Sequence, residues 1–148
     1  MLPLLVSAAL VLIADQTTKY YIRVMLPDGR SVTIVKGLLY ITHVRNKGAV
    51  FGLFSGKQTL FIVATLLSIC LIVFYYVKMR ETLFVLNTAL GLELGGAIGN
   101  LIDRLSRGWV TDFIHVRDFP VFNIADSAIV VGVVLLLFVS LLNIVKKG

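Results

Sequence analysis

Two aspartates in the second half of the chain, Asp112 and Asp126, are the residues best suited to chemistry. Asp112 lies between two apolar runs, and Asp126 lies at the start of the last run. Two carboxyl groups held close together cannot both ionise easily, so such a pair shares a proton and can position a water molecule. The ionised carboxylate can draw a proton from the water while the protonated one polarises a carbonyl group. The pair therefore predicts acid–base catalysis of hydrolysis.

The position of Asp126 indicates how the pair divides its proton. Asn123 has the character of a helix N-cap, and Asp126 then occupies the third position of the helix. The helix dipole stabilises an anion there, so we expect the charge on Asp126 and the proton on Asp112, in a pair that titrates as a unit. A plain capping role for Asp126 and an ordinary surface position for Asp112 are the alternatives.

Further polar residues interrupt or border the apolar runs. Asp15 and Lys19 are four residues apart in the first run, so they share a helical face and can partly neutralise each other. We interpret them as a structural pair, with a proton relay as the alternative. Ionisable groups are costly in lipid and usually face the interior of a helix bundle or a wet cavity. Of the remaining candidates, Asn100 and Arg104 close the third apolar run, Asn123 opens the fourth, and Asn46 lies in the segment between the first two.

Composition places these residues in a membrane protein. Of the 148 residues, 58% are hydrophobic, well above the roughly 45–50% of soluble domains. A spanning helix needs about 20 mostly apolar residues. The first apolar run lacks a basic leading region and contains Asp15 and Lys19, so we expect a retained helix and not a cleaved signal sequence. The chain reads as one domain, 1–148, with four spans at roughly 2–25, 58–77, 82–102 and 123–145.

The segment between the first two spans, roughly 27–57, has a different character. Residues 31–35 and 38–44 alternate in the period-two manner of strands, and Asp28-Gly29 and Lys36-Gly37 provide turns. We expect a small sheet lying on the membrane, followed by an irregular interfacial loop over 46–56. Residues 108–116 also read as extended.

Antiparallel helices bring the candidates together. The end of the third span and the start of the fourth meet at one membrane face. The segment 27–57 lies on that face as well, because it joins the end of the first span to the start of the second. The small residues Gly91, Gly95 and Gly99 form one stripe of the third span, which allows another helix to approach closely. The topology therefore gathers at one interface Asn46, Asn100, Arg104, Asp112, Asn123 and Asp126.

Several other classes of protein fit the sequence poorly. Cys70 is the only cysteine, which excludes an intramolecular disulfide and a cysteine-based metal site. His43 and His115 form no HExxH pair on one helical face, so we do not expect a zinc peptidase. The net charge of +6 is spread over loops and ends, which favours membrane lipids over nucleic acid as partners. Ser55 and Ser106 lack a nucleophile-elbow context, so we do not expect a serine intramembrane peptidase. A small transporter or channel subunit is the main alternative, because intramembrane polar residues also line ion paths.

Five ordered blocks of the chain resemble the type II (lipoprotein) signal peptidases. They are Asp15-Gln16-Thr17-Thr18-Lys19, Asn46-Lys47-Gly48-Ala49-Val50-Phe51-Gly52, Gly95-Gly96-Ala97-Ile98-Gly99-Asn100-Leu101-Ile102-Asp103-Arg104, Val110-Thr111-Asp112-Phe113 and Phe119-Pro120-Val121-Phe122-Asn123-Ile124-Ala125-Asp126-Ser127. Two departures are Val50, where a small Ala is common in the family, and Glu93, in a stretch that is usually apolar.

This resemblance implies a membrane aspartyl endopeptidase of the bacterial inner membrane. Its substrates would be prolipoprotein signal peptides, cut on the amino side of a diacylglyceryl-modified cysteine without metal or cofactor. Both termini would be cytoplasmic and the site would lie at the outer leaflet, an orientation that a count of positive charges does not give. We also expect a monomer. The resemblance makes Asp112 and Asp126 catalytic, and it gives substrate-binding or supporting roles to Asp15, Lys19, Asn46, Gly48, Asn100, Arg104 and Asn123.

Overall fold

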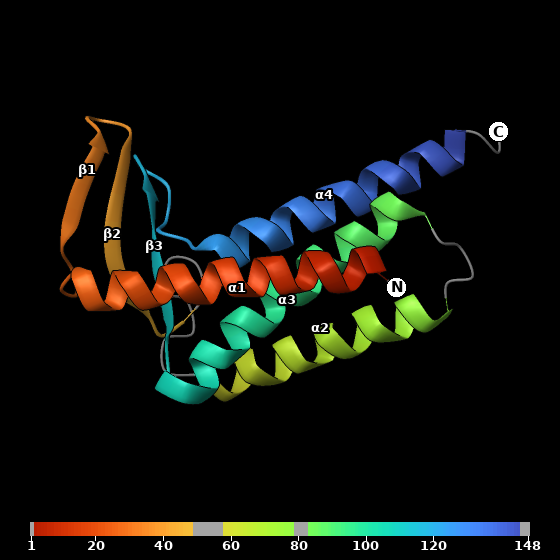
Figure 1. The fold of residues 1–148 in the computed structure, drawn as a ribbon, viewed down its shortest axis with the longest axis horizontal. Coiled ribbons are helices and arrows are strands. Elements are labelled where there is room, and N and C mark those ends of the chain that lie inside the picture. The colour runs from red at the N-terminus through yellow and green to blue at the C-terminus, as the bar shows by residue number, and fades with distance from the viewer. Residues whose placement is uncertain (1, 49–57, 79–82, 146–148) are drawn as a thin grey trace.

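Four long helices and a three-stranded sheet make up the protein in a computed structural model that describes residues 2–48, 58–78 and 83–145 (Figure 1). The helices are α1 (Leu2–Met25), α2 (Gln58–Lys78), α3 (Phe84–Arg107) and α4 (Ile124–Val145). All four are long and apolar enough to cross a membrane. The mainly helical membrane fold expected from the sequence is therefore confirmed.

The third helix ends later than expected. Its predicted end lay near residue 102, but the helix continues to Arg107. Gly108 stops it in the left-handed conformation, with φ 84°, and donates its backbone N–H to the carbonyl oxygen of Arg104 at 3.1 Å. The extra turn is polar because it emerges from the apolar layer, which is why hydropathy alone placed the boundary too early.

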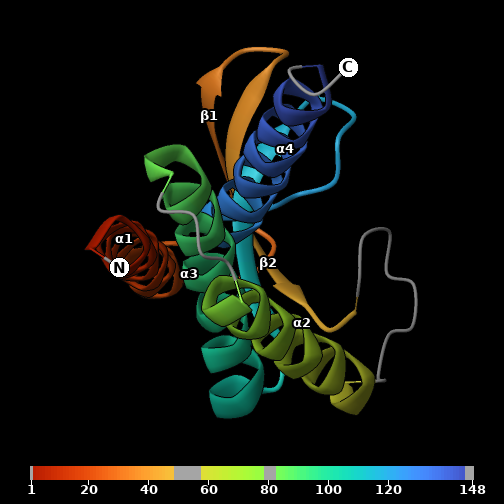
Figure 2. The same ribbon diagram turned by 90° about the vertical axis from the view of Figure 1, so that its right-hand side faces the viewer.

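Helix α3 is the centre of the bundle, in contact with the other three helices (Figure 2). More than half of its most apolar stretch is buried inside the protein, against 6% for α2 and 17% for α4. Glycines make the close approach possible. A Cβ on Gly95 would lie 2.5 Å from the carbonyl oxygen of Ala8 in α1, and one on Gly96 would lie 2.5 Å from that of Ala125 in α4. These two glycines thus let both helices pack directly against the α3 backbone.

The sheet lies at the end of the bundle opposite to the start of α1 and the end of α4 (Figure 1). Its antiparallel strands run in the order β1 (Ser31–Val35), β2 (Leu39–Asn46) and β3 (Val110–Val116). Gly29 and Gly37, with φ of 74° and 78°, make the two turns that the sequence predicted. The predicted hairpin is confirmed, and the extended segment after α3 adds a third strand that its local pattern did not assign to the sheet.

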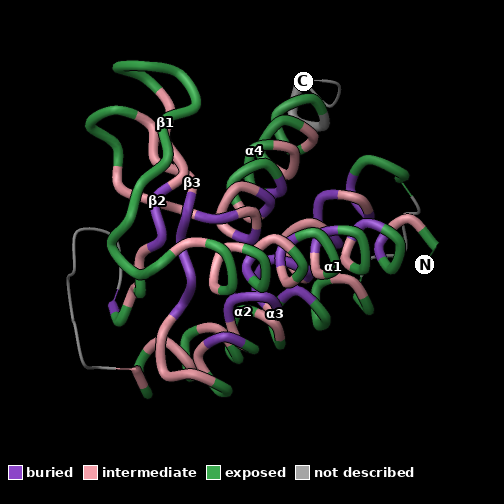
Figure 3. Tube along the Cα trace, turned by 60° about the vertical axis from the view of Figure 1, so that its left-hand side comes forward, coloured by how far each residue is buried: buried purple, intermediate pink, exposed green. Residues whose placement is uncertain are grey.

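Strand β3 links the sheet to the helices. It pairs with β2 through its length, and its first half is buried where the ends of α1 and α3 meet (Figure 3). Phe122, just before α4, pairs with Ile114 of β3. The strand therefore places its own side chains directly beside the first turn of α4. Residues 49–57, which include most of the predicted interfacial loop and Val50, lie outside the described residues.

Candidate active site

Asp112 lies on the buried half of β3 and is only 2% exposed. Its Oδ2 atom accepts a hydrogen bond from Asn46 Nδ2 at 2.8 Å, and its Oδ1 atom accepts one from Asn123 Nδ2 at 2.6 Å. The two donors come from the end of β2 and from the residue before α4. The sheet and the helix bundle therefore both hold this carboxyl group.

Asp126 lies in the first turn of α4, in the capping arrangement that the sequence predicted. Its backbone N–H donates to Asn123 Oδ1 at 2.9 Å, and the Asn123 backbone N–H donates to Asp126 Oδ2 at 3.2 Å. The other carboxylate oxygen accepts a hydrogen bond from Asn100 Nδ2 of α3 at 2.8 Å. Asp126 is thus a helix cap, but its second oxygen is held by a different helix in the same network as Asp112.

Asn123 joins the two carboxyl groups and is completely buried. Its amide nitrogen donates to Asp112, and its amide oxygen and backbone N–H complete the cap with Asp126. Asn123 Nδ2 also lies 3.2 Å from Asn100 Oδ1, which accepts a second hydrogen bond from Lys19 Nζ at 2.9 Å. Because a lysine only donates, this contact fixes the orientation of the Asn100 amide, whose nitrogen then faces Asp126.

The electrostatic surroundings of Asp112 favour its protonated form. Burial and the negative charge of Asp126 raise the pKa of Asp112 from 3.8 to about 7, although the hydrogen bonds from Asn46 and Asn123 and the charge of Lys19 act in the opposite direction. Asp112 therefore retains its proton up to neutral pH. This agrees with the assignment of the proton to Asp112 that the sequence suggested.

Asp15 and Lys19 form the ion pair expected from their spacing, with Nζ 2.8 Å from Oδ2 and both side chains fully buried. Asp15 Oδ1 also accepts the backbone N–H of Ala125 at 3.0 Å, next to Asp126. A buried charge costs several kcal/mol unless it is paired and hydrogen-bonded. This pair is satisfied on both sides, so it fixes α1 against the start of α4.

Asp103 is the residue whose importance the sequence pattern did not reveal. It is fully buried and lies 3.5 Å from Lys19 Nζ, 3.4 Å from Arg23 and 3.3 Å from Arg107. Its Oδ2 atom accepts the backbone N–H of Thr111, the residue before Asp112, at 2.9 Å. Its place four residues before Arg107 was a signal, but the contacts with α1 and β3 are long-range. Asp103 fixes the start of the strand that carries Asp112.

Two other predicted residues lie at the edge of the network. Arg104 makes no ion pair within the described part of the chain; its guanidinium lies over the ring of Phe61 at 5.3 Å, within electrostatic range of both site aspartates. The backbone N–H of Gly48 donates to Asn46 Oδ1 at 2.9 Å. This contact directs the amide nitrogen of Asn46 toward Asp112.

The two histidines lie apart from the carboxyl groups. His43 Nδ1 is 2.7 Å from the carbonyl oxygen of Leu26, and His115 Nδ1 is 3.2 Å from Thr42 Oγ1. Across residues 2–48, 58–78 and 83–145, no three side chains of His, Cys, Asp or Glu gather as a metal site. The chemical groups of the candidate site are therefore carboxyl groups, amides and the surrounding buried cations.

Fold and site together define a multi-pass membrane protein with a carboxyl pair at one end of its helix bundle, beside a small sheet. Comparison with known proteins gives the family. The model of the family described as "Signal peptidase (SPase) II" matches residues 7–142. A lipoprotein signal peptidase of Pelotomaculum thermopropionicum is 44% identical over 140 residues, which cover 95% of this chain and 91% of that protein. The chain therefore belongs to the signal peptidase II family and is a peptidase.

Two solved structures agree with this assignment. A bacterial membrane enzyme determined by the in meso method at 2.3 Å resolution superposes with a TM-score of 0.93 at 37% identity, over 98% of this chain and 91% of that one. A second, at 1.9 Å resolution, gives a TM-score of 0.86 at 38% identity, over 93% and 92% of the two chains. The arrangement of helices and sheet is thus shared over nearly the whole chain.

Proposed function

We propose that this protein is an aspartyl endopeptidase that removes signal peptides from bacterial prolipoproteins, on the amino side of a diacylglyceryl-modified cysteine. Membership of the signal peptidase II family supports the substrate class. The observation that carries the aspartyl mechanism is the network in which Asn123 contacts both Asp112 and Asp126. It supplies two buried carboxyl groups, one to activate a water molecule and one to polarise the peptide carbonyl group.

The reaction begins with Asp112 protonated and Asp126 ionised. Asp126 takes a proton from a water molecule as the water oxygen attacks the peptide carbonyl carbon, and Asp112 donates its proton to the carbonyl oxygen. The tetrahedral intermediate then collapses: Asp112 recovers a proton from the hydroxyl group, and Asp126 delivers its proton to the leaving nitrogen as the C–N bond breaks. One water is consumed, and both carboxyl groups return to their starting states.

The polar residues around the pair position it. Asn46 and Asn123 hold the two oxygens of Asp112, and Asn100 holds Asp126. Asp15 and Lys19 act one layer further out, since Lys19 fixes the Asn100 amide. Arg104 and Gly48 are proposed to contact or orient the substrate backbone, because Gly48 touches Asn46 of the network and Arg104 lies within electrostatic range of both aspartates.

The proposal includes an orientation. The termini face the cytoplasm, and the sheet and carboxyl pair lie at the outer leaflet of the bacterial cytoplasmic membrane. Prolipoproteins present their modified cysteine at that surface, so the pair would meet the bond at the level of the headgroups. We propose that the protein acts as a monomer, without metal or cofactor.

Purified protein in detergent, mixed with a diacylglyceryl-modified precursor peptide, tests the proposal. Wild type should release the signal peptide in the presence of chelator, and Asp112→Asn and Asp126→Asn should each abolish release while unfolding normally on heating. An Asp28→Asn variant is the matched control, because Asp28 and its partner Arg45 are both about half-exposed and the substitution should not affect cleavage. A purified protein that never cleaves the peptide but moves ions across vesicles would favour the transporter alternative instead.

A further inference from the structure

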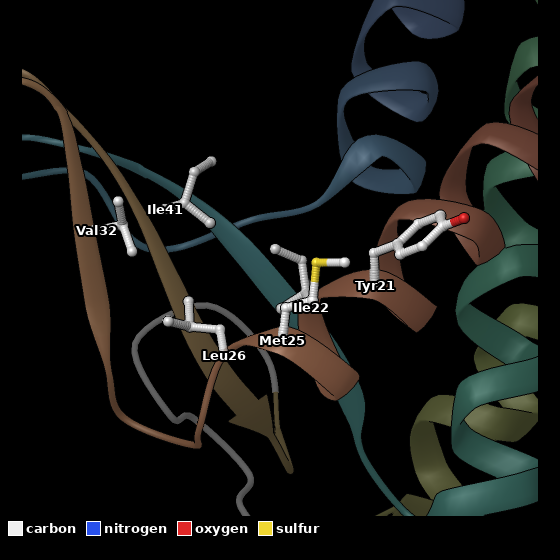
Figure 4. Close-up of a pocket in the computed structure, with 6 residues that line it drawn as sticks. All are labelled: Tyr21, Ile22, Met25, Leu26, Val32 and Ile41. Atoms are coloured by element: carbon white, nitrogen blue, oxygen red, sulfur yellow. The ribbon is translucent and has the colours of Figure 1, made fainter.

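An apolar groove separates the last turn of α1 from the sheet, away from the carboxyl pair (Figure 4). Its volume is about 250 Å³. Helix and sheet side chains face each other across it, and Figure 4 shows the hydroxyl of Tyr21 directed away from the sheet. The lining residues are Tyr21, Ile22, Met25, Leu26, Val32 and Ile41.

The groove exists because the sheet has two unlike faces. Val32 pairs with Ile41, and Ile41 pairs with Ile114, so an apolar row crosses all three strands. Successive side chains point to opposite faces of a strand. On the other face, Thr42 Oγ1 lies 2.8 Å from Ser31 Oγ and 3.2 Å from a ring nitrogen of His115. The sheet thus turns its apolar face toward α1 and its polar face away.

The groove is continuous with the surface that faces lipid. Leu10 and Ile13, each 64% exposed, lie on the outer side of spanning helix α1, and Met25, 72% exposed, continues that surface into the groove. Filling a groove lined by apolar side chains with water is unfavourable. A hydrocarbon chain can enter sideways from the bilayer without crossing water, so acyl chains are the natural contents.

A positive charge stands at the start of the edge strand β1, which lines the groove. Arg30 immediately precedes β1, two residues before the groove residue Val32, and it makes no ion pair with another described residue, whereas Arg45 is paired with Asp28. Cations beside a membrane surface attract anionic headgroups. We propose that the groove holds one acyl chain of a bilayer phospholipid, with an anionic headgroup near Arg30.

Such a lipid would contact the strands that carry the active-site residues. Ile114 lies two residues after Asp112 on β3, and β2 carries both Ile41 and Asn46. A chain held between α1 and these strands keeps the sheet against the helix end. The strands that position Asp112 and its donor Asn46 are then braced by lipid.

Photolabelling of the full-length wild-type protein tests the site. The protein is placed in nanodiscs of phosphatidylcholine and phosphatidylglycerol that contain a trace of phosphatidylglycerol with a diazirine in its acyl chain. After irradiation, labelled residues are mapped by peptide mass spectrometry. We expect label on Val32 and Ile41 of the sheet as well as on Met25, with label on Leu10 as the reference for ordinary lipid contact.

Groove-filling variants give the control. Ile41→Trp should reduce the sheet label several-fold relative to Leu10, whereas Tyr40→Trp, the same side chain on the opposite face, should leave it unchanged. Val32→Trp, at a half-exposed position of the edge strand, fills the same space and replaces Ile41→Trp if that variant does not fold. Label confined to the helices, equal sheet label in all variants, or sheet label displaced by a lipidated precursor peptide would each overturn the proposal.

Discussion

Replacing Asn123 with alanine should slow cleavage and move the alkaline limb of its pH profile to higher pH. Asn123 donates a 2.6 Å hydrogen bond to Asp112 Oδ1, and this bond stabilises the ionised form of Asp112. Without it, Asp112 holds its proton more tightly. Asp112 must be protonated to act as the acid, so the alkaline loss of activity follows its pKa. Because that pKa is higher in the variant, the alkaline limb moves to higher pH.

The size of the shift follows from the strength of the lost bond. A hydrogen bond to a charged group contributes about 1.5–3 kcal/mol. Since one pKa unit corresponds to about 1.4 kcal/mol, the pKa of Asp112 should rise by about one to two units from its value of about 7. The lost N-cap costs about 1 kcal/mol of stability, and the looser placement of Asp126 should lower kcat by roughly 100-fold.

The assay is kcat against pH for a lipidated precursor peptide in detergent micelles. Asn46→Ala is the matched control, because it removes the 2.8 Å donor to the other oxygen of Asp112 but leaves the cap of α4 intact. It should shift the alkaline limb in the same direction with little loss of thermal stability. An alkaline limb that stays in place, or moves to lower pH, in both variants would refute the assignment of the acid to Asp112.

Three further changes test other parts of the structure. Between pH 3.8 and about 7, Asp112 keeps its proton in the folded protein but loses it in the unfolded chain, so the free energy of unfolding should fall as the pH rises through this window. Thermal melts at pH 5 and pH 8 should show a smaller difference in Asp112→Asn than in wild type. Lys19→Met leaves buried Asp15 without its partner and should cost about 3–5 kcal/mol in detergent unfolding, partly recovered by adding Asp15→Asn. Gly96→Val places a Cβ against the α4 backbone at Ala125 and should cost about 1–3 kcal/mol and reduce cleavage; unchanged melting would contradict the packing.

Local sequence signals predicted the parts of the fold that depend on neighbouring residues. Spans follow from hydropathy, the hairpin from alternation and its glycine turns, and the cap of α4 from Asn123 and Asp126 three residues apart. These features need no knowledge of the rest of the chain. The structure confirms each of them, apart from the late end of α3.

Features that depend on distant residues could not be predicted in the same way. Nothing local to residues 110–116 shows that they pair with β2, and this pairing is what brings Asn46 to Asp112. Likewise, Asp103 looked like a polar residue at a helix end, but its contacts with Lys19 and Thr111 arise only when three elements meet. The topology alone predicted that the polar residues gather at one interface, but not which atoms touch.

Infrared titration of the carboxyl groups tests the central claim most directly, namely that Asp112 and Asp126 share one proton at neutral pH. Wild type should show a protonated carboxyl band near neutral pH that disappears with a midpoint of about pH 7 and is absent from Asp112→Asn. In Asp126→Asn the band should persist and titrate at lower pH, because the neighbouring charge that raises the Asp112 pKa is gone. A wild-type spectrum without that band, or a band that survives unchanged in Asp112→Asn, would contradict the account.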